Sequence, residues 1–96
     1  MRKYEITFIV KPDLEEGAIK ECVDSMKNII ETKGATLIEA KEMGQRELAY
    51  EIKKYKNGYY FYFLIEAENN NAITEFDRVA LINENIIRHL IVRIDE

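Results

Sequence analysis

The sequence predicts an α+β fold of the ferredoxin-like type, a split βαβ arrangement with the order β-α-β-β-α-β. Three observations lead there: four stretches have strand patterning, two amphipathic helical stretches separate them, and residues 57–68 are nearly all aromatic or β-branched. Because crossover connections return right-handed, interleaving the two units gives a four-stranded antiparallel sheet in the order 4-1-3-2. Both helices then cover one face of the sheet, and the other face is bare.

Residues 2–10 alternate between apolar and polar side chains, as a half-buried strand does. Only Ile9 breaks the pattern. A helix follows, for which Asp13 is the expected N-cap and Glu16 its capping-box partner, although Gly17 weakens the first turn. Gly34 is expected just past the helix end. One apolar stripe faces the core and consists of Ile19, Cys22, Val23, Met26, Ile29 and Ile30.

Residues 35–52 are extended, highly charged between 39 and 47 and interrupted by Gly44, which is typical of a protected edge strand. Residues 53–58 then predict a basic hairpin connection, with Asn57-Gly58 as turn residues at the start of the central strand. In that strand we expect the odd positions to face the core: Tyr59, Phe61, Phe63, Ile65 and Ala67.

The even positions of the central strand place Tyr60, Tyr62 and Leu64 on the bare face. This apolar area is either a contact surface or ordinary filling of a sheet, and both interpretations stay open. After the possible N-caps of residues 69–71, a second helix is expected to turn these side chains inward: Ile73, Phe76, Val79, Ala80 and Leu81. In the last strand, residues 86–94, we expect Ile87, His89 and Ile91 on the core side and Arg88, Leu90 and Val92 on the bare face.

Composition indicates one domain, residues 1–96, with 47% hydrophobic and 33% charged residues. No apolar run approaches the roughly 20 residues of a membrane span, and the start of the chain does not resemble a signal peptide. The lone Cys22 cannot form an internal disulfide, in agreement with a reducing cytoplasm. The net charge is −4, which argues against nucleic-acid binding through a general basic surface.

Catalysis has little support, because a single histidine and a single cysteine cannot form a nucleophile–base pair or a zinc site. We expect no enzyme activity, metal or cofactor. His89 is expected either to have a structural role or simply to lie near an edge that faces RNA. Base stacking of the RNA-recognition-motif kind is also not expected, since Tyr59 and Phe61 face inward and Glu5 would repel phosphate. The distributed basic residues could still contact an RNA backbone: Arg2, Lys3, Arg46, Lys53, Lys54, Lys56, Arg88 and Arg93.

Five segments carry a resemblance to a known family: residues 1–5, 34–35, 44–54, 58–59 and 83–89. In order and spacing they resemble the bacterial small ribosomal subunit protein S6 family over nearly the whole chain. The Arg-x-Leu-Ala-Tyr run of residues 46–50 is the most specific part. Glu47 and Glu51 depart from the family's usual basic residue and proline, which predicts a weaker or shifted contact along this edge.

The resemblance implies a non-enzymatic protein of the cytoplasmic ribosome that binds the central domain of small-subunit RNA together with the basic S18 protein. It also implies a monomer when partners are absent. We expect RNA contacts at Arg2, Lys3, Arg46, Lys54, Lys56, Arg88 and Arg93. We expect contacts to the partner protein at Tyr50, Tyr60, Tyr62 and Leu90.

Two alternatives share the fold. A regulatory module could dimerise through its sheet and bind a small metabolite, although the sequence shows no convergent polar pocket. A small acyl-phosphate hydrolase is more remote, because it needs an arginine-bearing anion cradle after the first strand, where this chain has residues Lys11-Pro12-Asp13.

Overall fold

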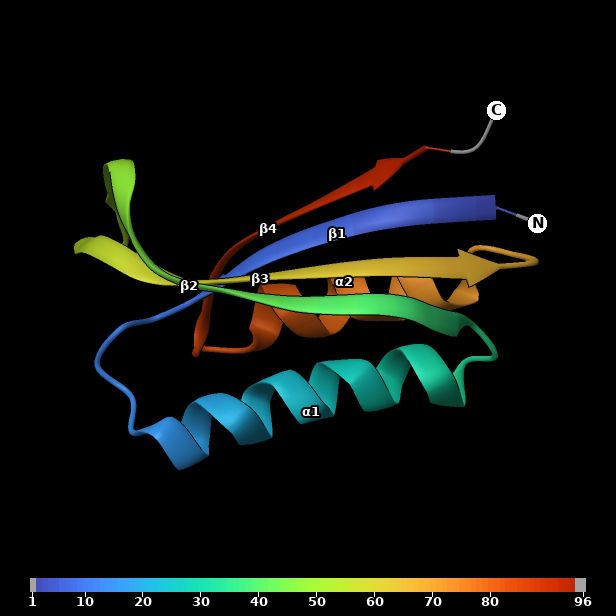
Figure 1. Cartoon of the computed structure of the whole chain (residues 1–96), viewed down its shortest axis with the longest axis horizontal. Coiled ribbons are helices and arrows are strands. Elements are labelled where there is room, and N and C mark those ends of the chain that lie inside the picture. Colours follow the sequence, from blue (N-terminus) through green and yellow to red (C-terminus); the bar gives the residue numbers. More distant parts are fainter. Residues whose placement is uncertain (1, 95–96) are drawn as a thin grey trace.

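The computed structural model describes residues 2–94 and contains the predicted elements in the predicted order (Figure 1). They are β1 (Arg2–Val10), α1 (Glu16–Thr32), β2 (Thr36–Ile52), β3 (Tyr55–Ala67), α2 (Asn71–Ile82) and β4 (Ile86–Arg93). The antiparallel strands are ordered β2-β3-β1-β4, which confirms the predicted sheet. Both helices lie on the same side of the sheet (Figure 1).

The main core lies between the sheet and the helices and is built around three phenylalanines. The ring of Phe8 in β1 lies 5.1 Å from that of Phe63 in β3 and 5.8 Å from that of Phe76 in α2. The odd positions of β3 face this core, and the apolar stripe of α1 packs against it, as predicted. Alternation of apolar and polar residues in the two central strands therefore defines which side the helices cover.

The two ends of α1 differ in how well they were predicted. The capping prediction was wrong: the N-cap is Glu15, without a side-chain cap bond, and Asp13 instead accepts a 3.5 Å hydrogen bond from the Tyr55 hydroxyl. At the C-terminal end, Gly34 has a φ of +85° as expected. The amides of Gly34 and Ala35 donate to the carbonyls of Glu31 and Ile30, which is the Schellman arrangement.

The hairpin between β2 and β3 is tighter than predicted. Its turn is Lys53-Lys54, with φ values of 49° and 72°, and β3 already begins at Tyr55. Asn57-Gly58 is therefore not the turn. Gly58 lies inside β3, where an added Cβ would overlap the Cγ2 atom of Ile9. The glycine is needed for this close approach between strands.

A β-bulge changes the predicted phase at the start of β4. Ile9 pairs with Arg88 but Val10 pairs with Ile86, so the register shifts by one residue. Ile86 consequently joins the main core, and Ile87, which we expected there, packs on the other face of the sheet. The expectation for Leu81 was also wrong: its side chain is 69% exposed.

A second, smaller core forms where the β2–β3 hairpin curls over the face without helices (Figure 1). It contains Ile9, Leu48 and Ile87, with Tyr55 and Tyr60 packed against them. Register shifts along β2 accompany the curl of this long edge strand. The break in alternation at Ile9 is thereby explained, because this side chain anchors the hairpin.

Replacing Gly58 by alanine should destabilise the fold by about 1–3 kcal/mol, because the new methyl group must displace Ile9 or the hairpin. Gly17→Ala is the matched control. Nothing lies within 4 Å of its Cβ position, and alanine favours a helix by up to about 1 kcal/mol. Urea unfolding measures both, and equal stability of the two variants would contradict the packing role of Gly58.

Candidate functional site

The candidate site is the side of the sheet that faces away from α1 and α2, which we call the open face. Register and alternation assign its members. From β1 and β3 they are Lys3, Glu5, Thr7, Ile9, Tyr60, Tyr62, Leu64 and Glu66, and from β2 and β4 they include Lys41, Arg88, Leu90 and Val92.

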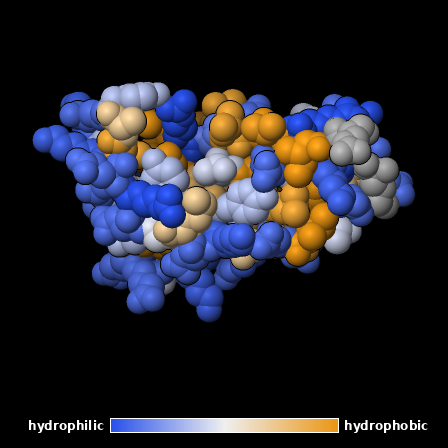
Figure 2. Space-filling view, turned by 45° about the horizontal axis from the view of Figure 1, so that its top comes forward, coloured by the Kyte–Doolittle hydropathy of each residue, from blue (hydrophilic) through white to orange (hydrophobic). Residues whose placement is uncertain are grey.

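An apolar band lies on the open face toward the end of the sheet where β1 begins and β4 ends, and apolar surface appears in orange in Figure 2. Leu90 and Val92 of β4 are 59% and 43% exposed, and Ile94 follows in the same phase. The register places Leu64 of β3 and Val92 of β4 on either side of Glu5. Apolar side chains exposed together in this way mark a surface for contact with another macromolecule.

A hydrogen-bonded pair sits in this band. The Tyr62 hydroxyl donates to Oε2 of Glu5 over 2.6 Å, and both side chains are half-buried. This hydrogen bond, helped by partial burial and the carboxylate charge, raises the pKa of Tyr62 to about 12. On its other side, the Tyr62 ring lies 5.9 Å from Nζ of Lys41, which forms a 3.2 Å salt bridge with Glu39.

A groove of about 250 Å³ adjoins the band beneath the curled hairpin. Tyr50, Tyr60 and Leu90 contribute to its walls, and Ile9 and Leu48 lie among its lining residues. The Arg88 guanidinium lies 5.7 Å from the centre of the Tyr50 ring and donates a hydrogen bond to the Tyr50 hydroxyl. This pair connects β4 to the hairpin across the groove.

The structure brings together the four residues expected to contact a partner protein. Three of them, Tyr50, Tyr60 and Leu90, line the groove. Tyr62 is one step away, because Thr7 pairs with Tyr62 on one side and with Leu90 on the other. The open face thus joins them into one continuous surface.

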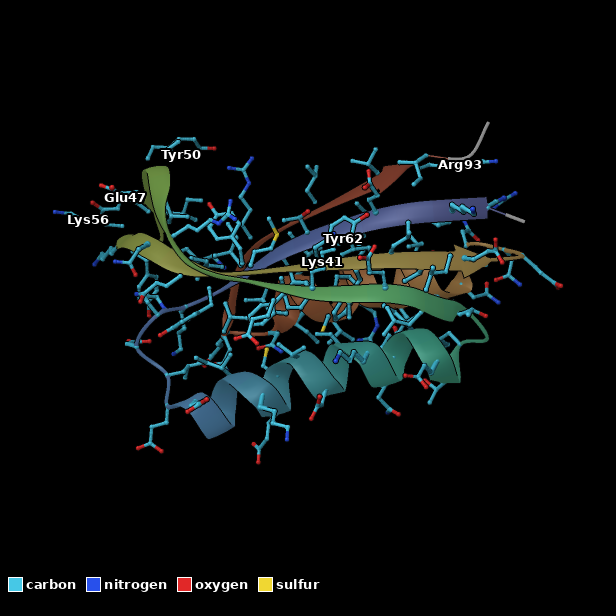
Figure 3. All side chains as sticks on the ribbon, in the orientation of Figure 1. Lys41, Glu47, Tyr50, Lys56, Tyr62 and Arg93 are labelled. Carbon is cyan, nitrogen blue, oxygen red and sulfur yellow. The ribbon has the colours of Figure 1, made fainter. Side chains whose placement is uncertain are left out.

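The seven basic residues expected to contact RNA do not form one patch. Arg46, Lys54, Lys56 and Arg88 lie on or beside the hairpin, whereas Arg2, Lys3 and Arg93 lie where β1 begins and β4 ends. Figure 3 shows Lys56 and Arg93 at opposite ends of the molecule, whose longest dimension is 37 Å. The apolar band separates the two basic groups, and Arg88 of the hairpin group lines the groove itself.

The histidine and the cysteine, which could in principle serve in catalysis, are held by contacts within the fold. Nε2 of His89 lies 2.7 Å from Oδ1 of Asp77 in α2, which agrees with its expected place on the helix side. Cys22 is buried in α1, and this burial raises the pKa of its thiol. Within residues 2–94, no group of three or more metal-binding side chains occurs, and no helix is long and apolar enough to cross a membrane.

Sequence reasoning missed two features of the open face. The hairpin anchor of Ile9, Leu48 and Ile87 was not foreseen, although the break in alternation at Ile9 was a usable signal. Alternation placed Glu5 on this face, but its bond to Tyr62 depends on the register between β1 and β3. Glu5 therefore belongs to the candidate site.

Comparison with known proteins agrees with this architecture. The family described as Ribosomal protein S6 matches residues 3–93. The crystal structure of 30S ribosomal protein S6 from Thermotoga maritima superposes with a TM-score of 0.92 and 31% sequence identity, covering 97% of this chain and 87% of that one. An Arabidopsis thaliana protein superposes with a TM-score of 0.58 at 13% identity, covering 100% and 95%, and shares the fold alone.

Tyrosine NMR should show that the hydroxyl of Tyr62 titrates near pH 12, and Glu5→Gln should lower its pKa toward the ordinary value of about 10. Because the pKa is raised by folding, the stabilising contribution of this group is complete below pH 10 and decreases as the pH rises toward 12. An ordinary Tyr62 titration in the wild-type chain would contradict the hydrogen bond.

Proposed function

Because this chain belongs to the ribosomal protein S6 family, a component of the small ribosomal subunit, we propose that it binds the central domain of small-subunit RNA cooperatively with the S18 protein. Membership in the family makes it a part of the cytoplasmic ribosome. The family's role is structural, and we propose the same for this chain, without enzymatic activity.

One observation carries the proposal: an apolar band lies between two groups of basic side chains, and an adjoining groove lies beside one of these groups. We assign the apolar middle to the partner protein, with Tyr50, Tyr60, Tyr62 and Leu90 as its main contacts. Aromatic and apolar anchors of this kind supply much of the binding energy of protein interfaces. The net charge of −4 supports a basic partner, which would supply phosphate neutralisation that this chain lacks.

The RNA contacts proposed for the basic groups are contacts to the sugar–phosphate backbone. Their residues are Arg2, Lys3, Arg46, Lys54, Lys56, Arg88 and Arg93. Base stacking on the open face is disfavoured, because Tyr60 packs against the hairpin anchor and Tyr62 is bonded to the Glu5 carboxylate. Two separated basic groups fit an RNA that spans the molecule and is recognised by the shape of its backbone.

Titration of the chain into a central-domain RNA fragment, with and without the S18 protein and across a salt series, tests this proposal. We expect tight, salt-sensitive binding only when the S18 protein is present. Equal RNA affinity with and without that protein would contradict cooperative binding. Absence of binding under both conditions would contradict the ribosomal assignment of the surface.

Lys54→Ala should weaken binding in the ternary assembly and reduce the salt slope by about 0.7 to 0.9, the value for one lost phosphate contact. Lys54 is exposed at the hairpin turn, so its removal should not disturb packing. Lys20→Ala, which removes an exposed lysine from α1, is the control with the same charge change. Identical salt slopes for the two variants would remove Lys54 from the RNA site.

The alternative of a regulatory module that dimerises through its sheet draws on the exposed apolar band. We propose instead that the free chain is a monomer, because a second copy would bring another acidic chain against the half-buried Glu5. Sedimentation at increasing protein concentration distinguishes the two, and a stable homodimer would favour the alternative.

A further inference from the structure

Glu5 occupies an unusual position for a carboxylate. It lies in the central strand β1, half-buried, with Leu64 and Val92 as its neighbours across the two adjacent strands. Leu90 and Val92 expose large apolar surfaces beside it. The residues that pair directly with Glu5 on both sides are apolar, so the carboxylate lies within the apolar band.

The Glu5 carboxylate is also incompletely satisfied. Among the described residues its hydrogen-bond partner is the Tyr62 hydroxyl, and it takes part in no salt bridge. The nearby Lys41 pairs with Glu39 on the edge strand. An ionised carboxylate can accept about four hydrogen bonds, so most of this capacity is left to solvent while the face is uncovered.

We propose that the Glu5 carboxylate, oriented by Tyr62, selects the occupant of the apolar band: a protein whose contact surface places a lysine or arginine side chain among apolar residues. This inference rests on the proposed function and specifies the chemistry of the partner at that site. Covering the band removes water from Glu5, and a buried charge without a counterion is strongly unfavourable. A cationic side chain opposite Glu5 offsets this penalty with a charge-assisted hydrogen bond.

The same carboxylate argues against other occupants. An RNA strand crossing the band would bring phosphates toward Glu5, and like charges repel at this range. A second copy of this chain carries the same net charge of −4 and the same acidic group in the middle of its face. Glu5 thus acts as an attractive element for a basic partner and a repulsive element against these competitors.

The test compares Glu5→Gln with Glu21→Gln, which removes the same charge from the exposed surface of α1. The probe is the S18 protein bound in the presence of the central-domain RNA fragment. We expect Glu5→Gln to lower the affinity for the S18 protein by about tenfold or more and to weaken its salt dependence, because the partner's cation loses its counterion. Glu21→Gln should bind like the wild type.

Tyr62→Phe provides a second variant that keeps the carboxylate but removes the hydrogen bond that orients it. We expect a smaller loss of affinity than for Glu5→Gln, with thermal unfolding reporting that both variants fold. Equal affinity of wild type and Glu5→Gln for the S18 protein would overturn the inference while leaving the proposed function intact. Tighter RNA binding by Glu5→Gln in the absence of the S18 protein would support the repulsive role of the carboxylate against RNA. Failure of the wild type to bind the S18 protein would instead contradict the proposed function itself.

Discussion

The right-handed return of both crossover connections is the constraint on which the rest of this structure depends. It places α1 and α2 on one side of the sheet and leaves the other side without helical cover (Figure 1). The uncovered side of the four-stranded sheet exposes apolar side chains, and a large exposed apolar patch usually binds another molecule or promotes aggregation. The side chains of the open face therefore serve two roles: some stabilise the fold, and others are available for binding.

This chain covers part of the open face itself. The β2–β3 hairpin curls over one end, where Ile9, Leu48 and Ile87 form a second core, and the contact between Arg88 and Tyr50 ties β4 to the hairpin. Toward the other end, Leu90 and Val92 have no such cover. The division explains why the binding surface proposed here begins at the groove under the hairpin and extends along β4.

Several features that depend on neighbouring residues in the sequence were predicted correctly. Alternation placed Phe61 and Phe63 inside, and the helical stripe and Gly34 defined the body and end of α1. The errors involve long-range geometry. Asn57-Gly58 has the sequence of a turn, but Gly58 lies within a strand, where the absence of a side chain lets Ile9 approach closely. The bulge that exchanges Ile86 for Ile87 depends on strand pairing. Sequence named the basic residues of the site and predicted that they are distributed, but the separation of the two groups along a molecule 37 Å long comes from the folded sheet.

Side-chain footprinting with hydroxyl radicals tests most directly whether the open face is the buried surface in the ribosomal assembly. In the complex with the RNA fragment and the S18 protein, Tyr62, Leu90 and Val92 should lose reactivity relative to the free chain. Leu81 and Ile82 of α2, which are apolar and 69% and 67% exposed, should keep theirs. Protection of Leu81 and Ile82 with an unprotected open face would contradict the account.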